Sequence, residues 1–181
     1  MKNQEQTLRK IPLEQFEDVI SYINKNIKDN KPISVLGASK GAEYALNLAS
    51  KYPEIDNLIL IAPSSYNFAG LDFKDYRSSW TYYGKELPYI DIKKSSFNSF
   101  LKNIIVPNII KSPISYKETY NSAIEKDSSS QEKLIPVKDV KANILMIVGE
   151  DDLMWDSLAM ANKIKEQNPK AKIYSYKGAG H

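Results

Sequence analysis

The chain has 181 residues, of which 42% are hydrophobic and 26% are charged, as in an ordinary globular domain. Its net charge of +3 gives no reason to expect a nucleic acid or an anionic membrane as a partner. It contains no cysteine, which excludes disulfides, thiolate metal sites and a cysteine nucleophile, and one histidine is too few for a zinc cluster.

Residues 1–20 are polar and lack the apolar core of a secretory signal. No apolar run approaches the roughly 20 residues that span a bilayer. We therefore expect a soluble, cytoplasmic protein that binds neither a membrane nor nucleic acid. No G-x-G-x-x-G or Walker A pattern occurs, so no motif supports a nucleotide-phosphate site, and we expect no cofactor and no metal.

The first third of the chain predicts a strand–helix–strand unit preceded by a helix. Residues 12–28 have apolar side chains three or four positions apart, which predicts a helix with one buried face, and Pro32 follows its end. Residues 33–37 predict a short buried strand, 40–51 a helix and 58–62 a second buried strand. The last three elements have the length of a βαβ crossover.

The middle of the chain has a different composition. Residues 63–135 are rich in Ser, Tyr, Asn and Lys and contain four prolines. They predict an insertion over the carboxyl edge of the sheet, within a single domain of residues 1–181. Inside it, only 116–126 predicts a helix, and 127–133 predicts a polar loop.

The regular pattern returns after the insertion. Residues 144–148 predict a third buried strand, 156–167 a helix, and 172–176 a strand nearer the sheet edge, because its apolar residues alternate. Residues 178–181 predict a flexible tail. Continuous apolar strands that alternate with helices indicate an α/β fold, with a parallel sheet and helices on both faces.

A serine follows the first predicted strand in a Gly-x-Ser-x-Gly pattern, at residues 37–41. A strand before it and a helix after it are what a nucleophile elbow requires, because the tight turn exposes the serine Oγ. Ser39 is therefore the candidate nucleophile, and the backbone N–H of Lys40 is a candidate donor to an oxyanion. The alternative is a glycine-rich turn with an incidental serine.

The remaining acid–base candidates lie after later strands. His181, the last residue, follows the final predicted strand, and two aspartates follow the strand at 144–148. The order Ser39, Asp152, His181 is that of α/β-hydrolases and differs from those of chymotrypsin and subtilisin. His181 would accept the Ser39 proton, and Asp152 would fix the imidazole tautomer.

Two neighbouring aspartates compete for the acid role. In α/β-hydrolases the acid is usually the third residue after the glycine that ends the strand, which selects Asp152 over Asp151. Asp151 is then solvated or caps the next turn. Capping is also the alternative explanation for both residues, because aspartate is common near the start of a helix.

Five segments of the chain carry a resemblance to a known family. They are LGASKGAE at 36–43, with an unusual lysine after the serine, SSWTYYGKELPY at 78–89, IPV at 135–137, VGEDD at 148–152 and YKGAGH at 176–181. With these segments, roughly residues 31–181 resemble the C-terminal catalytic domain of the acyl-CoA thioesterase / bile acid-CoA:amino acid N-acyltransferase family. The resemblance implies an α/β-hydrolase fold.

The resemblance also implies acyl transfer from a thioester through a covalent acyl-enzyme on Ser39. Serine is usual in the thioesterases of the family and cysteine in the amino-acid conjugating enzymes, so Ser39 favours hydrolysis of an acyl thioester such as an acyl-CoA. Transfer to an amine with the same three residues is the alternative. The aromatic side chains of the insertion either line an acyl pocket or pack the insertion onto the sheet: Tyr66, Phe68, Phe73, Tyr76, Trp80, Tyr82, Tyr83 and Tyr89.

The chain departs from the family pattern at both ends. Nothing in it represents the family's N-terminal β-sandwich, the strands before residue 33 or the closing helix after His181. One of two oxyanion donors would then be missing, at a typical cost of about 10²–10³ in rate, so a catalytically weak fragment or a binding domain is a third alternative. Residues 33–37 would form an exposed apolar sheet edge, and we expect self-association through it or a longer parent protein.

Overall fold

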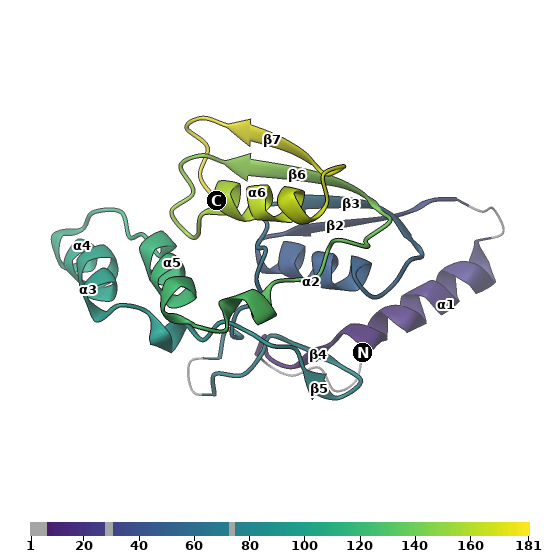
Figure 1. Ribbon diagram of the computed structural model, residues 1–181, viewed down its shortest axis with the longest axis horizontal. Coiled ribbons are helices and arrows are strands. Elements are labelled where there is room, and N and C mark those ends of the chain that lie inside the picture. The colour runs from purple at the N-terminus through teal and green to yellow at the C-terminus, as the bar shows by residue number, and fades with distance from the viewer. Residues whose placement is uncertain (1–6, 28–30, 73–74) are drawn as a thin grey trace.

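The centre of the fold is a four-stranded parallel sheet with the strand order β2-β3-β6-β7 (Figure 1). A computed structural model of the chain describes residues 7–27, 31–72 and 75–181. The strands are β2 (Ile33–Ala38), β3 (Ile55–Ile61), β6 (Asn143–Gly149) and β7 (Lys172–Tyr176). All four were predicted, and the predicted α/β fold with a parallel sheet is confirmed. The observed strand bounds lie within one residue of the predicted ones, except that β3 begins three residues earlier than predicted.

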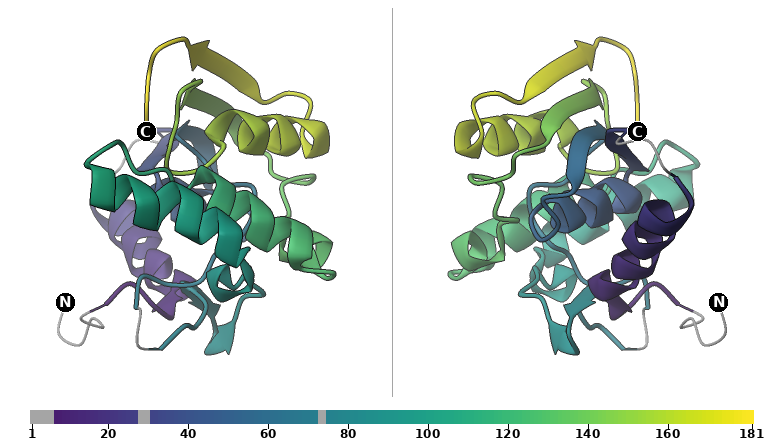
Figure 2. Two further views of the ribbon diagram at one scale, coloured as in Figure 1. Left: turned by 90° about the vertical axis from the view of Figure 1, so that its left-hand side faces the viewer. Right: turned by 90° about the vertical axis from the view of Figure 1, so that its right-hand side faces the viewer.

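Two helices connect these strands and lie on the same face of the sheet (Figures 1 and 2). They are α2 (Lys40–Ala49), between β2 and β3, and α6 (Ser157–Gln167), between β6 and β7. The opposite face is open: Leu36 is 63% exposed and Tyr174 is 56% exposed. In the described part of the chain the sheet therefore carries one helical layer rather than the two that were expected.

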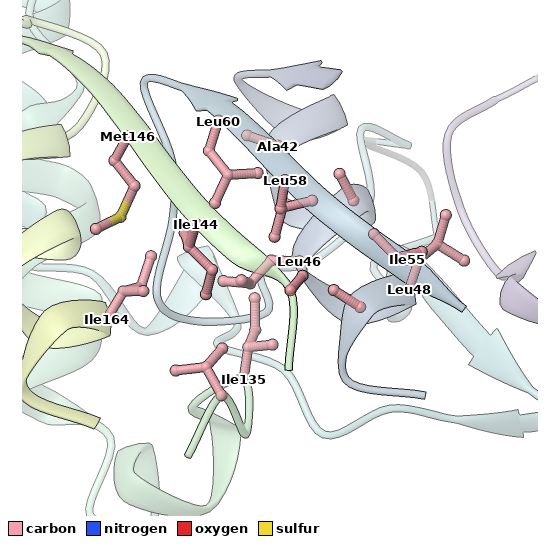
Figure 3. Packing of buried hydrophobic residues seen from close by; sticks show 14 of the residues in the cluster. Ala42, Leu46, Leu48, Ile55, Leu58, Leu60, Ile135, Ile144, Met146 and Ile164 are labelled. Carbon is pink, nitrogen blue, oxygen red and sulfur yellow. The ribbon is translucent and has the colours of Figure 1, made fainter. Parts of the chain in front are cut away.

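The hydrophobic core lies between the sheet and this helical layer (Figure 3). Strand side chains alternate between faces, so Leu58, Leu60, Ile144 and Met146 point toward the helices and are buried. From α2 the inward apolar side chains are Ala42, Ala45, Leu46, Leu48 and Ala49. Burial of each large aliphatic side chain stabilises the fold by about 1.5–3 kcal/mol.

The first helix is shorter and less buried than predicted. A 3-10 turn at Leu13–Gln15 precedes α1 (Phe16–Asn26), and residues 28–30, which include the predicted end, lie outside the described residues. Phe16 packs against Tyr52, with ring centroids 5.4 Å apart. Ile20 packs partly against the core, whereas Val19 is 47% and Ile27 46% exposed, so the predicted buried face is covered only in part.

Strand β2 forms one edge of the sheet. It pairs only with β3 among the described residues. Residues 11 and 12 do not cover it, because they form a short strand, β1 (Ile11–Pro12), that pairs with β4 (Trp80–Tyr82). The exposed edge expected at residues 33–37 is thus present in the described chain. Self-association through it stays a prediction.

Residues 63–135 leave the sheet after β3 and return before β6. They contain a hairpin of β4 (Trp80–Tyr82) and β5 (Lys85–Glu86), the helices α3 (Phe97–Phe100), α4 (Val106–Ile110) and α5 (Lys117–Lys126), and 3-10 turns at Ile92–Lys94 and Ser130–Lys133. The helix predicted at 116–126 corresponds to α5. A π-helical turn, Leu101–Ile105, joins α3 to α4, and this continuous segment was not predicted.

The helices of this region lie at the end of the molecule away from α1 (Figure 1). Within residues 7–27, 31–72 and 75–181, none of the helices combines the length and the apolar character needed to cross a bilayer.

Candidate active site

Ser39 occupies a strained turn between β2 and α2. Its backbone has φ 53° and ψ −123°, a region that a non-glycine residue adopts only where the surroundings enforce it. The Ser39 N–H donates to the Ile61 carbonyl at 2.8 Å, which ties the turn to β3. A Cβ on Gly37 would lie 2.2 Å from the Gly41 carbonyl oxygen, so only glycine fits there. These contacts hold Ser39 in the strand–turn–helix context that the sequence predicted.

The three candidate residues from distant parts of the chain lie within hydrogen-bond distance of one another. His181 Nε2 is 2.6 Å from Ser39 Oγ, and His181 Nδ1 is 2.9 Å from Asp152 Oδ2. A carboxylate only accepts, so the short contact to Asp152 places the proton of a neutral imidazole on Nδ1. Nε2 is then free to accept the Ser39 hydroxyl proton.

Asp152 is buried and its carboxylate is held by several donors. Besides His181, its Oδ1 accepts the backbone N–H groups of Met154 at 2.9 Å and Trp155 at 3.3 Å. Asp151 points elsewhere: its carboxylate accepts the Gly178 N–H at 2.9 Å and is exposed. The geometry therefore separates the two aspartates, and only Asp152 contacts the histidine.

The segment 178–181 was expected to be flexible, but in the structure it is fixed against the end of β6. The Asp151 N–H donates to the Ala179 carbonyl at 3.0 Å. A Cβ on Gly149 would lie 2.2 Å from the Gly180 carbonyl oxygen and 2.3 Å from that of Ala179. Because the loop needs this close approach, Gly149 positions the segment that carries His181.

An aromatic wall that the sequence did not predict supports the histidine. The Trp155 ring meets the His181 ring edge to face, with centroids 5.0 Å apart and an interplanar angle of 88°. Trp155 Nε1 donates to the Ala62 carbonyl at 3.2 Å, and its ring also contacts Phe68 and Tyr120. This packing restricts rotation of the imidazole.

The Lys40 side chain turns inward from the start of α2. Its Nζ lies 2.7 Å from Glu43 Oε2 and 3.4 Å from the Phe68 carbonyl oxygen. Burial lowers the pKa of Lys40 and raises that of Glu43, and their mutual attraction opposes both shifts.

Glu43 connects the nucleophile helix to the insertion and was not predicted as part of the site. Its Oε1 accepts from Trp80 Nε1 at 2.7 Å and from the Phe68 N–H at 3.1 Å. The only signal in the sequence was an opposite charge three residues after Lys40, a spacing that usually marks a surface pair. Phe68 and Trp80 are buried here, so these two aromatics pack the insertion onto the core, and Phe73 lies outside the described residues.

Lys40 is the first residue of α2, so its backbone N–H is among the groups that have no partner inside the helix. It follows Ser39 directly and lies at the positive end of the helix dipole, where negative charge is stabilised. This is the position expected for an oxyanion donor.

A largely apolar cavity of about 550 Å³ lies under the insertion. Tyr120 and Met154 line it, and both contact partners of the histidine: the Tyr120 ring lies 5.6 Å from that of Trp155 between centroids, and the Met154 N–H donates to Asp152 Oδ1. Burial raises the pKa of Tyr120 to about 12, so it stays neutral. In the described part of the chain, no three His, Asp or Glu side chains are grouped so as to hold a metal ion.

A profile of the family described as BAAT / Acyl-CoA thioester hydrolase C terminal matches residues 11–181. The chain belongs to this family. The BAAT / Acyl-CoA thioester hydrolase relatives include human acyl-coenzyme A thioesterase 1, 25% identical over 97% of this chain, and mouse bile acid-CoA:amino acid N-acyltransferase, 26% identical over 96%. The chain spans 38% of the length of each of these two relatives.

Solved structures support the fold assignment for this family member. A carboxylesterase of the thaumarchaeon Nitrososphaera gargenis superposes with a TM-score of 0.50, 14% identity, and coverage of 99% of this chain and 71% of the other. An esterase of Pyrococcus furiosus superposes with a TM-score of 0.51, 16% identity, and coverage of 93% and 52%. The α/β-hydrolase fold is thereby confirmed.

Proposed function

We propose that this chain carries the catalytic centre of a serine hydrolase that cleaves acyl thioesters through an acyl-Ser39 intermediate. The observation that carries the proposal is the continuous contact from Ser39 Oγ through His181 to Asp152, with 2.6 and 2.9 Å between the bonded atoms. Family membership supports a thioester as the substrate class.

The first half of the reaction forms the acyl-enzyme. Ser39 Oγ attacks the thioester carbonyl carbon while its proton moves to His181 Nε2, and Asp152 stabilises the imidazolium. The carbonyl oxygen becomes an oxyanion next to the Lys40 backbone N–H. The intermediate then collapses with cleavage of the carbon–sulfur bond, and His181 returns the proton to the departing thiolate.

The second half releases the acid. Water loses a proton to His181 Nε2 and attacks the acyl carbon, and Ser39 Oγ leaves and is reprotonated by His181. The cavity of about 550 Å³ supports an apolar acyl chain as the part of the substrate that is bound, since most of its lining is apolar.

A second candidate function is acyl transfer to an amine. It is favoured by the mouse relative named an N-acyltransferase, which is as similar to this chain as the thioesterases are. The same acyl-Ser39 intermediate would serve both reactions, with an amine replacing water in the second half.

Labelling with a fluorophosphonate probe and mass mapping tests the proposal, because the probe reacts only with an activated serine. We expect modification of Ser39, its loss in Ser39→Ala, and unchanged labelling in Ser175→Ala, a control at an exposed strand serine. A folded protein without labelling would contradict the proposal and favour a binding domain.

A matched pair of aspartate variants tests the assigned roles. Asp152→Asn should lower hydrolysis of a medium-chain acyl-CoA by on the order of 10⁴, because the amide no longer fixes the imidazole tautomer. Asp151→Asn removes the exposed neighbour and should cost less than tenfold. Equal losses would contradict the assignment, and an acyl-amide product formed only with added amine would favour transfer.

A further inference from the structure

The helical segment 97–110, called the outer helix below, exposes a continuous apolar face. It comprises α3, the π-helical turn and α4. Ile109 is 74% exposed and Ile110 is 66% exposed. Leu101 and Ile105, which are 40% and 37% exposed, continue the same face, since Leu101, Ile105 and Ile109 are spaced four residues apart. A four-residue spacing drifts around an α-helix, and the wider π-turn in the middle reduces that drift.

The outer helix carries apolar side chains on both its inward and its outward side. Ile104 is 9% exposed and lines the cavity of about 550 Å³ together with Phe97 and Phe100. The inward side thus has its packing and its cavity, while the outward side has no cover among the described residues. Contiguous exposed apolar surface of this kind marks an interaction site.

Lysines surround this face and acidic residues are absent from it. Residues 92–117 contain five lysines and neither aspartate nor glutamate. Two of these lysines are compensated, since Lys94 pairs with Asp127 at 3.5 Å and Lys117 pairs with Asp156 at 2.9 Å.

The other three lysines keep an uncompensated positive charge. Lys93 lines the cavity and lies over the Tyr76 ring, with its Nζ 4.0 Å from the centroid, so it does not belong to the outward face. Lys102 and Lys111 lie on the outer helix or at its end, and neither pairs with an acidic group of the described chain. The surface therefore combines an apolar stripe with a positive rim.

We propose that the outer helix docks on the surface of an anionic lipid bilayer. The order of its groups matches that surface, because the apolar stripe would enter the acyl boundary while Lys102 and Lys111 meet the negative headgroups. The segment is shorter than the roughly 20 residues that span a bilayer, so it lies in the interface plane.

Charge favours the bilayer over a second copy of the chain. A twofold contact between two outer helices would bring Lys102 and Lys111 of one copy against the same lysines of the other, and like charges in contact oppose association. The net charge of +3 hides this feature, because the lysines of the outer helix are balanced by acidic residues elsewhere in the chain.

Vesicle flotation with the full chain tests the proposal. We expect binding to vesicles of phosphatidylglycerol and phosphatidylcholine, weaker binding as salt rises, and little binding to phosphatidylcholine alone. Lys102→Ala and Lys111→Ala should each lower the partition coefficient roughly fivefold, since a lysine near an anionic surface contributes about that factor. Ile109→Ser should lower it about tenfold or more, because it removes a membrane-facing aliphatic side chain.

Two controls keep the result specific. Tyr22→Ser changes an aromatic side chain on α1 that is 66% exposed, and this variant should bind vesicles as the unchanged chain does. Ser39→Ala should also bind normally, which separates this proposal from the proposed activity. Thermal unfolding checks that Ile109→Ser is folded. Equal binding to both kinds of vesicle, no binding, or a dimer that Ile109→Ser disperses would overturn the proposal, the last by assigning the face to a second copy.

Discussion

Helix α2 and the outer helix carry the same kind of sequence and have opposite surroundings. Both have apolar side chains at helical spacing and both contain lysine. In α2 the apolar side chains are covered by the sheet, and even Lys40 is drawn inside to Glu43. In the outer helix the apolar face and its lysines point outward. Apolar side chains at helical spacing are thus present in both helices, and only the neighbouring elements decide whether they are covered.

Two buried ion pairs also differ in what holds them together: Lys40–Glu43 on α2 and Lys133–Asp127 at the base of the insertion. Burial dominates the Lys40–Glu43 pair, lowering the pKa of the lysine and raising that of the glutamate. At the base of the insertion, burial also opposes ionisation of Asp127, but hydrogen bonds from Lys133 and Ser129 outweigh it and lower the pKa of Asp127 to about 2. The first pair is held by the packing around it, whereas the second contributes its own stabilisation.

The largest effect is expected from Lys40→Met, because it leaves the Glu43 carboxylate buried without its partner. We expect a loss of about 3–5 kcal/mol in the free energy of unfolding, measured with urea. The double variant Lys40→Met/Glu43→Gln should lose less than Lys40→Met alone, since the amide oxygen still accepts from Trp80. A double variant as unstable as the sum of the two single ones would contradict this account.

Leu46→Ala should destabilise the protein by about 2–5 kcal/mol. Leu46 is fully buried between α2 and the sheet, so the change leaves a cavity that the surroundings fill only in part. Denaturation with urea at an unchanged m-value would measure this loss. A loss below 1 kcal/mol would mean that α2 is covered less tightly than its burial indicates.

Gly149→Ala should cost about 1–3 kcal/mol, because its Cβ would overlap the carbonyl oxygens of residues 179 and 180. We also expect fluorophosphonate labelling of Ser39 to slow at least tenfold, since the loop that carries His181 must shift. Gly180→Ala is the matched control, because a Cβ there meets no atom within 4 Å. Similar losses in both variants would remove the steric explanation.

A pH effect of at most about 2 kcal/mol is expected from Asp127. Its folded pKa of about 2 lies below the ordinary 3.8, so its contribution is complete above pH 4 and is lost as the pH falls toward 2. The difference in unfolding free energy between the unchanged chain and Asp127→Asn should therefore shrink between pH 5 and pH 2. A difference that is independent of pH would argue against the ion pairs with Lys94 and Lys133.

The smallest effect is expected from Ile109→Ala, the counterpart of Leu46→Ala on the outer helix. Its side chain is exposed, so the free energy of unfolding should change by less than about 0.5 kcal/mol. A loss comparable to that of Leu46→Ala in dilute protein would show that the outer helix is covered in solution, and the comparison between the two helices would fail.

Much of the candidate site was predictable because its parts are local. The glycines, the serine and the flanking strand and helix of the elbow all lie within a few residues, and the order Ser39, Asp152, His181 is a property of the chain. The choice of Asp152 over Asp151 followed from its position after Gly149, and the observed contact of Asp152 with His181 agrees with it.

The contacts that position these residues join segments far apart in the chain. No local pattern indicates that Trp155 meets His181, that Glu43 reaches Trp80, or that Gly149 touches the loop before His181. The outer helix was missed because Pro107 and the surrounding polar residues weaken the helical pattern at 97–110. Proline is nevertheless tolerated there, because it lies in the first turn of α4 after the π-turn.

The amino-acid sequence by itself determined the alternation of strands and helices, the elbow and the identity of the three candidate residues, because these depend on side-chain periodicity and on short spacings. Tertiary structure alone decided that Lys40 is buried, that one face of the sheet is open and that the outer helix points outward. Those outcomes depend on which surfaces meet, and the free energy of burial is set by neighbours that a linear pattern does not contain.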